Sequence, residues 1–273
     1  MDSGLRNMSA SLIDDFRSQG YSYLEDAIPS DEVGAVRDSV ERDVLAHSLL
    51  PPPSGYVPGF LRFNRALAPY VASKPVLSFV ESLLGPHVRI SMFTGTVNAP
   101  GIPRGDLHSD WPYNQAGEAR IPAPYPDCLM HIVTIWMLSD FTEMGGGTIV
   151  VPGSHRQPDH PRKDGPIAPL NPYPGEKQIV GRAGSLVAFD ARLWHAVAEN
   201  RTGRPRVAAI VRYAPWWLNV NPLRPGTVDR EDIVEAHNGK DSQVPSLPRE
   251  VFEKLPREVQ RLVHYSVVDS TAA

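Results

Sequence analysis

Cysteine is nearly absent from this sequence of 273 residues, in which Cys128 is the only one. One thiol cannot form a disulfide within the chain, and it cannot supply a metal cluster held by several thiolates. Any metal in this protein must therefore be held by histidine and carboxylate side chains. The near-absence of cysteine also fits the reducing cytoplasm, where we expect the protein to reside.

Long apolar runs and a basic excess are missing as well. No stretch reaches the ~18 apolar residues that a membrane span needs, and residues 1–15 lack the charged-then-apolar pattern of a secretory signal. The formal net charge is only −4, whereas proteins that bind nucleic acid usually carry a basic excess. We therefore expect a monomer or homodimer that acts on a small molecule and binds neither nucleic acid nor a membrane.

The first third of the chain has apolar residues at helical spacing. Residues 9–18 and 74–84 are predicted helices, and Gly85 provides a glycine stop for the second. Between them, Ser30 is a good N-cap for a helix with one apolar face. That face carries Val33, Val36, Val40, Val44 and Leu45.

The middle of the chain changes to short runs rich in β-branched and aromatic residues, each bounded by Gly, Pro or Asp. The predicted strands span residues 88–97, 131–138, 148–151, 178–180, 185–189, 195–197 and 207–213. Short strands at this spacing are typical of a β-sandwich or barrel. The 28 prolines are concentrated in four stretches, which predicts long ordered loops there. These stretches are 51–58, 103–126, 152–174 and 215–225.

We therefore expect one domain over residues 1–273, mainly β with flanking helices and a jelly-roll core. Residues 1–86 would form a mostly helical flank, residues 87–215 the β core, and residues 216–273 a C-terminal loop with helices. Within the last region, the near-duplicate Leu-Pro-Arg-Glu-Val segments at 247–251 and 255–259 predict two short helices, each with a proline near its start.

Two residues of one short segment are the first candidates for a metal site. His108 and Asp110 are two positions apart, so both side chains lie on the same face if the segment is extended. An imidazole and a carboxylate that converge on one point make two thirds of the 2-His-1-carboxylate triad, which leaves coordination positions open on Fe(II). The His-x-Asp pattern alone is a weak signal, because such short motifs also occur by chance.

His195 is the best candidate for the third ligand, although it could also be a core histidine packed under Trp194. After it, Asn200 and a turn lead into a strand that opens with Arg206. This strand would pair back against His195, and a guanidinium there could bind a carboxylate in bidentate fashion. Arg212 shares the strand parity of Arg206 and remains a weaker alternative.

Four segments, in this order along the chain, resemble the phytanoyl-CoA dioxygenase-like (PhyH) family of Fe(II)/2-oxoglutarate oxygenases. They are residues 107–111, 146–155, 183–195 and 200–206. The resemblance implies a double-stranded β-helix, a cupin-like fold, with His108, Asp110 and His195 as iron ligands. It also implies that Arg206 pairs with the distal carboxylate of 2-oxoglutarate, with further cosubstrate contacts on the neighbouring strands. Those contacts would be near Asn98, Thr134 and Trp136.

The same resemblance implies an oxidoreductase that uses Fe(II), 2-oxoglutarate and O2. Related halogenases replace the carboxylate ligand by a small residue, so the presence of Asp110 predicts hydroxylation or another oxidation instead of halogenation. The substrate pocket is expected to include residues of the loops that follow the metal segment and the last core strand. These residues are Trp111, Tyr113, Asn114 and Trp216, which could equally be anchors of their loops.

A small molecule such as a natural-product intermediate is favoured over an acyl-CoA, because no basic cluster suggests a site for the CoA phosphates. Residues 98–101, 152–155 and 192–195 also resemble dioxygenases of antibiotic biosynthesis. Two alternatives stay open at this point. One is a cupin-type metal enzyme that does not use 2-oxoglutarate, and the other is a non-catalytic jelly-roll binding protein.

Overall fold

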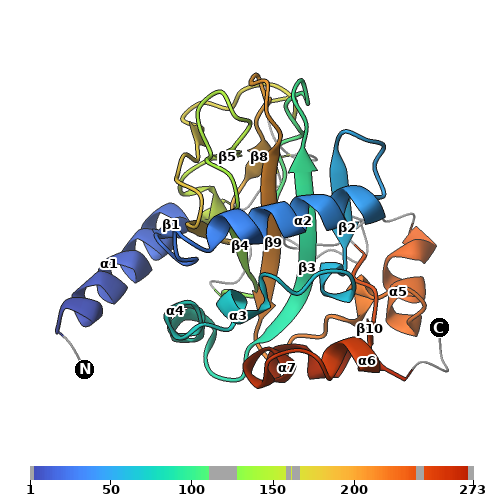
Figure 1. Cartoon of the computed structure of the whole chain (residues 1–273). Helices are drawn as coiled ribbons and strands as arrows, with labels where there is room; N and C mark the ends of the chain where they lie inside the picture. Colours follow the sequence, from blue (N-terminus) through green and yellow to red (C-terminus); the bar gives the residue numbers. More distant parts are fainter. Residues whose placement is uncertain (1–2, 111–127, 158–160, 162–166, 238–242, 270–273) are drawn as a thin grey trace.

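The computed structural model describes residues 3–110, 128–157, 161, 167–237 and 243–269 (Figure 1). Its centre is a six-stranded antiparallel sheet in the order β1-β7-β4-β9-β3-β2, faced by a three-stranded sheet in the order β6-β5-β8. The strands of the large sheet are β1 (Tyr21–Leu24), β2 (Gly55–Pro58), β3 (Arg89–Asn98), β4 (Ile132–Met137), β7 (Leu186–Asp190) and β9 (Arg206–Ala214). Those of the small sheet are β5 (Thr148–Val150), β6 (Lys177–Gln178) and β8 (His195–Val197).

Helices cover one face of the large sheet. Figure 1 shows α2 crossing in front of β9 and β3, with α3, α4 and α7 below it. The main helices are α1 (Ser3–Gln19), α2 (Val33–His47), α3 (Ala68–Val71), α4 (Lys74–Leu84), α5 (Val228–Ile233), α6 (Arg249–Phe252) and α7 (Arg257–Val263). Short 3-10 turns lie at Phe60–Arg62, Ser154–Arg156, Asn221–Leu223, Glu235–His237 and His264–Ser266, and β10 (Leu247–Pro248) pairs with β11 (Val267–Val268). None of the helices in the described ranges is long and apolar enough to cross a membrane.

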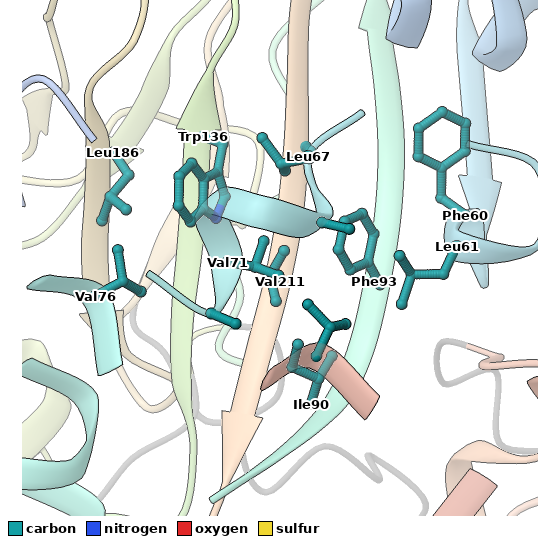
Figure 2. Packing of buried hydrophobic residues seen from close by; sticks show 14 of the residues in the cluster. Phe60, Leu61, Leu67, Val71, Val76, Ile90, Phe93, Trp136, Leu186 and Val211 are labelled. Atoms are coloured by element: carbon teal, nitrogen blue, oxygen red, sulfur yellow. The ribbon is translucent and has the colours of Figure 1, made fainter. Parts of the chain in front are cut away.

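The two largest clusters of buried hydrophobic residues lie on opposite faces of the large sheet. The larger cluster lies under the helices, where Trp136, Leu186 and Val211 of the sheet pack against Leu67 and Val71 (Figure 2). The second cluster lies between the two sheets and includes Val133 and Ile135 of β4 with Val150 of β5. The central strands β4, β7 and β9 therefore have almost no solvent face, because alternate side chains enter one or the other cluster.

Strand β9 shows this alternation most clearly. Val207, Ala209, Val211 and Tyr213 pack into the core under the helices. The residues between them face the space between the two sheets, where Ala208 and Ile210 contact the second core. By the same alternation Arg206 and Arg212, at the two ends of the strand, also face this space. The strand thus carries two arginines toward the interior.

The helices confirm most of the local predictions. Helix α4 spans the predicted residues and ends at Gly85, and α6 and α7 follow Pro248 and Pro256 as expected. The N-cap prediction for Ser30 is wrong, because α2 begins at Val33 after a turn in which the Glu32 and Val33 amides both donate to the Pro29 carbonyl.

Two other local expectations need correction. Val36, Val40 and Val44 are buried as expected on α2, but Leu45 is 38% exposed and lies off the buried face. The first proline-rich stretch is not only a loop, since it contains β2. That strand is at the edge of the sheet, where proline is tolerated because one side of the strand makes no ladder hydrogen bonds.

Candidate metal centre

The structure brings His108, Asp110 and His195 together at one end of the space between the sheets. One potential ligand atom from each residue lies within 4.8 Å of those of the other two. The backbones of the two histidines pair directly, since the His108 amide donates to the His195 carbonyl at 2.9 Å and the reverse bond is 2.8 Å. The Asp110 amide donates to the Ala191 carbonyl at 2.7 Å. Extended pairing therefore aims both His108 and Asp110 at His195, as the His-x-Asp spacing predicts.

Both imidazoles are oriented by backbone carbonyls. Nδ1 of His108 lies 2.7 Å from the carbonyl oxygen of Asp106, and Nδ1 of His195 lies 2.8 Å from that of Leu193. A carbonyl can only accept, so each Nδ1 carries a proton and each Nε2 is the nitrogen left to bind a metal. This is the arrangement in which metal-bound histidines are commonly fixed.

Asp110 is held by a buried arginine that sequence analysis ranked as a secondary candidate. Nη2 of Arg212 lies 3.0 Å from Oδ2 of Asp110, and the same oxygen is 3.8 Å from Nε2 of His195. Burial by itself would raise the pKa of the Asp110 carboxyl, but the charge of Arg212 and the two imidazoles hold it well below its usual range. Asp110 is therefore a carboxylate, as a metal ligand must be.

A further buried histidine, which sequence analysis did not single out, lies beside this pair. His131 is 1% exposed and precedes β4, at a position that alternation directs to the same side as Val133. Burial and the nearby charge of Arg212 lower the pKa of His131 well below its ordinary value of 6.5, opposed by Asp110. The imidazole is therefore neutral. No sequence signal distinguishes it, because it belongs to no spacing motif.

Arg206 lies at the other end of β9 and is almost fully buried, at 6% exposure. Its guanidinium carbon lies 4.6 Å from the centroid of the Phe141 ring, and its Nε donor has no hydrogen-bond partner. Burial lowers the pKa of Arg206 to about 10, and no described carboxylate forms an ion pair with it. A buried charge without a partner is costly, so this guanidinium is suited to an anionic ligand.

Other unpaired polar atoms lie on the same inner faces of β3 and β9. In the pairing of the two strands Asn98 is opposite Arg206, and Thr94 is opposite Ile210. Nδ2 of Asn98, Oγ1 of Thr94 and Nε of Arg212 are all buried without a hydrogen-bond partner. Two neutral donors, from Asn98 and Thr94, and a guanidinium that no described carboxylate pairs fit a dianionic molecule that reaches from the three candidate ligands toward Arg206.

Of the other predicted cosubstrate residues, Asn98 faces this space, whereas Thr134 and Trp136 do not. Thr134 Oγ1 donates to the Val211 carbonyl at 2.9 Å and accepts from Nε1 of Trp136 at 3.1 Å. Trp136 is fully buried in the core under the helices (Figure 2). The expected contacts of these two residues are therefore corrected, because alternation along β4 turns Val133 and Ile135 inward in their place.

The predicted substrate residues are not gathered by the described part of the structure. Trp216 is 56% exposed and lines a surface groove of about 450 Å³ with residues of α4 and α7. Trp111, Tyr113 and Asn114 lie outside the described residues. Thr94 was not among the residues that the sequence singled out, since only the pairing of β3 with β9 shows that it faces the space between the sheets.

Comparison with known proteins finds a family that matches most of the chain. The model of the family described as phytanoyl-CoA dioxygenase (PhyH) matches residues 16–208. The ectoine dioxygenase of Nocardia farcinica is 29% identical over 224 residues, which cover 70% of this chain and 72% of that protein.

Solved structures give the same fold. HygX from Streptomyces hygroscopicus, solved with nickel, 2-oxoglutarate and hygromycin B, is 17% identical with a TM-score of 0.60, over 77% of this chain and 88% of its own. The epimerase SnoN, solved with Fe3+, α-ketoglutarate and nogalamycin RO, is 21% identical with a TM-score of 0.61, over 77% of this chain and 84% of its own. The predicted jelly-roll fold is thereby confirmed.

Proposed function

Since the chain belongs to the phytanoyl-CoA dioxygenase (PhyH) family, we propose that it is an oxygenase dependent on Fe(II), 2-oxoglutarate and O2. The observation that carries the proposal is the combination of His108, Asp110 and His195 with a buried guanidinium, on the same inner surface, that no described carboxylate neutralises. The three ligands support an iron site in general. Arg206 narrows the proposal to an enzyme with an anionic cosubstrate, which disfavours a cupin-type metal enzyme without 2-oxoglutarate.

The residues of the chain have distinct tasks in this proposal. Nε2 of both histidines and the Asp110 carboxylate would hold the metal on one side and leave the opposite positions open. Arg206 would bind the distal carboxylate of 2-oxoglutarate, with Asn98 and Thr94 as further donors. The bound metal and cosubstrate would supply the oxidising chemistry, while the sheets exclude water from it.

The substrate we propose is a small molecule such as a natural-product intermediate. HygX and SnoN were solved with hygromycin B and a nogalamycin compound, and the Nocardia relative is named for ectoine. The retained carboxylate Asp110 supports hydroxylation or another oxidation, and not halogenation, because no halide can replace a ligand that is present. We also propose a single domain over residues 1–273, a cytoplasmic location, and a monomer or homodimer.

The test is the visible spectrum of the protein with Fe(II) and 2-oxoglutarate under anaerobic conditions. A weak metal-to-ligand charge-transfer band is expected for the wild type, because 2-oxoglutarate would chelate the iron. The band should saturate at far higher 2-oxoglutarate concentration in Arg206→Met than in Arg230→Met. Arg230 is a matched control, since it is equally buried but paired with Glu235 in the C-terminal part of the chain. Iron binding without any such band in the wild type would leave the cupin-type alternative as the better explanation.

A further inference from the structure

The Asp110 carboxylate has a partner that a three-ligand metal centre does not itself require. Arg212 is 2% exposed, and its Nη2 lies 3.0 Å from Oδ2 of Asp110. Arg212 belongs to a central strand, opposite Met92 of β3 on one side and Val133 of β4 on the other. Its carbonyl also accepts from the Ser91 hydroxyl at 3.2 Å. The base of this arginine is therefore fixed on both sides.

Asp110 is held less firmly by its own backbone. It lies outside the named strands, and its amide makes one hydrogen bond to the Ala191 carbonyl. The last side-chain torsion of aspartate is broad, so backbone position alone does not decide which carboxylate oxygen faces the two imidazoles. In the structure Oδ2 accepts from Arg212 and is also the oxygen 3.8 Å from Nε2 of His195. Because a carboxylate oxygen has two lone pairs, Oδ2 can accept a hydrogen bond from Arg212 and bind a metal ion at the same time.

We propose that Arg212 is a positioning residue, which holds the carboxylate of Asp110 in the orientation in which it binds the metal. The inference rests on the proposed function and assigns Arg212 a task distinct from that of Arg206. Metal-binding carboxylates are usually hydrogen-bonded by a second layer of residues, and loss of such a partner weakens metal binding. The positive charge of Arg212 acts in the opposite sense, since it repels a cation. The two effects predict opposite changes in metal affinity on removal of the guanidinium, so a measurement separates them.

The experiment is a titration of the full chain with cobalt(II) alone, followed by the visible absorption bands of the bound ion. We compare the wild type with Arg212→Met, Arg212→Lys and the control Arg230→Met. Arg212→Met is expected to weaken cobalt binding about 10–100-fold, the usual effect of losing such a partner. Arg212→Lys should recover part of the loss, since it keeps a charged donor, and Arg230→Met should match the wild type. At saturation the cobalt bands of Arg212→Met should change in intensity, because a free carboxylate can turn and bind through both oxygens.

Equal or tighter cobalt binding by folded Arg212→Met would overturn the inference. So would an unchanged cobalt affinity combined with lost 2-oxoglutarate binding, which would make Arg212 a cosubstrate ligand. Should Arg212→Met fail to fold, Arg212→Lys carries the test, and an affinity equal to that of the wild type with unaltered bands then counts against positioning. A wild-type chain that binds neither cobalt nor iron would refute the proposed function as well, whereas normal wild-type binding with no effect of Arg212 refutes only this inference.

Discussion

The two ends of β9 place the same residue type in opposite electrostatic situations. Arg206 and Arg212 lie on the same face of one strand, and both are buried between the sheets. Arg212 is neutralised by Asp110, whereas Arg206 has an aromatic ring and no described carboxylate beside it. A buried charge that another residue of the chain neutralises contributes to the folded structure itself. A buried charge without such a partner indicates that a ligand of opposite charge binds there. The comparison predicts opposite changes in the free energy of unfolding when a charge is removed at each end, that of Asp110 beside Arg212 or that of Arg206 itself.

The largest effect is expected at the paired end, from Asp110→Asn. The substitution leaves Arg212 as an uncompensated buried charge, which should lower the free energy of unfolding by about 3–5 kcal/mol. It should also abolish iron binding, because one of the three ligands loses its charge. Urea unfolding of the metal-free chain and an iron titration measure the two effects. A stability equal to that of the wild type would show that the Asp110–Arg212 pair is not the neutral unit described here.

At the unpaired end, Arg206→Met should act in the reverse direction on stability. Without metal or cosubstrate, replacing an unpaired buried guanidinium by an apolar side chain should raise the free energy of unfolding by about 1–2 kcal/mol, after loss of the contact with Phe141. The same variant should bind 2-oxoglutarate about 100-fold more weakly, the equivalent of two charge-assisted hydrogen bonds. Urea unfolding and the charge-transfer titration check the two parts. A destabilised Arg206→Met would mean that the wild-type guanidinium has a partner and that the comparison fails.

The sequence indicated the three residues that the structure brings together, because spacing and strand alternation are local properties. His108 and Asp110 share a face by their separation alone, and His195 follows from its place before the last core strand. Parity could not separate Arg206 from Arg212, since both occupy the same face. Only the tertiary arrangement shows that one of them meets Asp110, which lies about a hundred residues earlier in the chain.

The error at Thr134 and Trp136 has a different cause. Strand β4 is buried on both faces, so its sequence shows no alternation of apolar and polar residues. A strand of this kind gives no indication of which residues face the space between the sheets. The error at Ser30 arises from local backbone structure, because the residues after it form a turn and α2 begins only at Val33.

Buried His131, beside the Asp110–Arg212 pair, also predicts that the stability of the metal-free protein depends on pH. Above pH 6.5, the ordinary pKa of histidine, His131 is neutral in the folded and unfolded chain and has no effect. Below it the unfolded chain takes up a proton that the folded chain does not, because the pKa of buried His131 is lowered. Stability of the metal-free protein should therefore fall on acidification, by at most about 1.4 kcal/mol per pH unit from this residue. Urea unfolding between pH 7.5 and pH 5.5 should show a smaller decrease for His131→Phe, and identical slopes would exclude a neutral buried His131.

The smallest effects are expected from substitutions of two threonines. Their hydroxyls lie on opposite faces of the large sheet and differ in whether they are hydrogen-bonded. Thr94 of β3 faces the space between the sheets with an unpaired hydroxyl, whereas Thr134 of β4 faces the helices with its hydroxyl bonded twice. Thr94→Val should leave stability unchanged or slightly raised and weaken 2-oxoglutarate binding about 10-fold, the value of one hydrogen bond to a charged group. Thr134→Val should cost about 1 kcal/mol of stability and leave cosubstrate affinity unchanged, because its bonds are neutral and lie within the core. Each variant is the other's control, since both replace a hydroxyl by a methyl group inside the same sheet. If Thr134→Val weakened 2-oxoglutarate binding more than Thr94→Val, the cosubstrate would have to bind on the face of the sheet that the helices cover. The proposed position of the cosubstrate beside Arg206 would then be wrong.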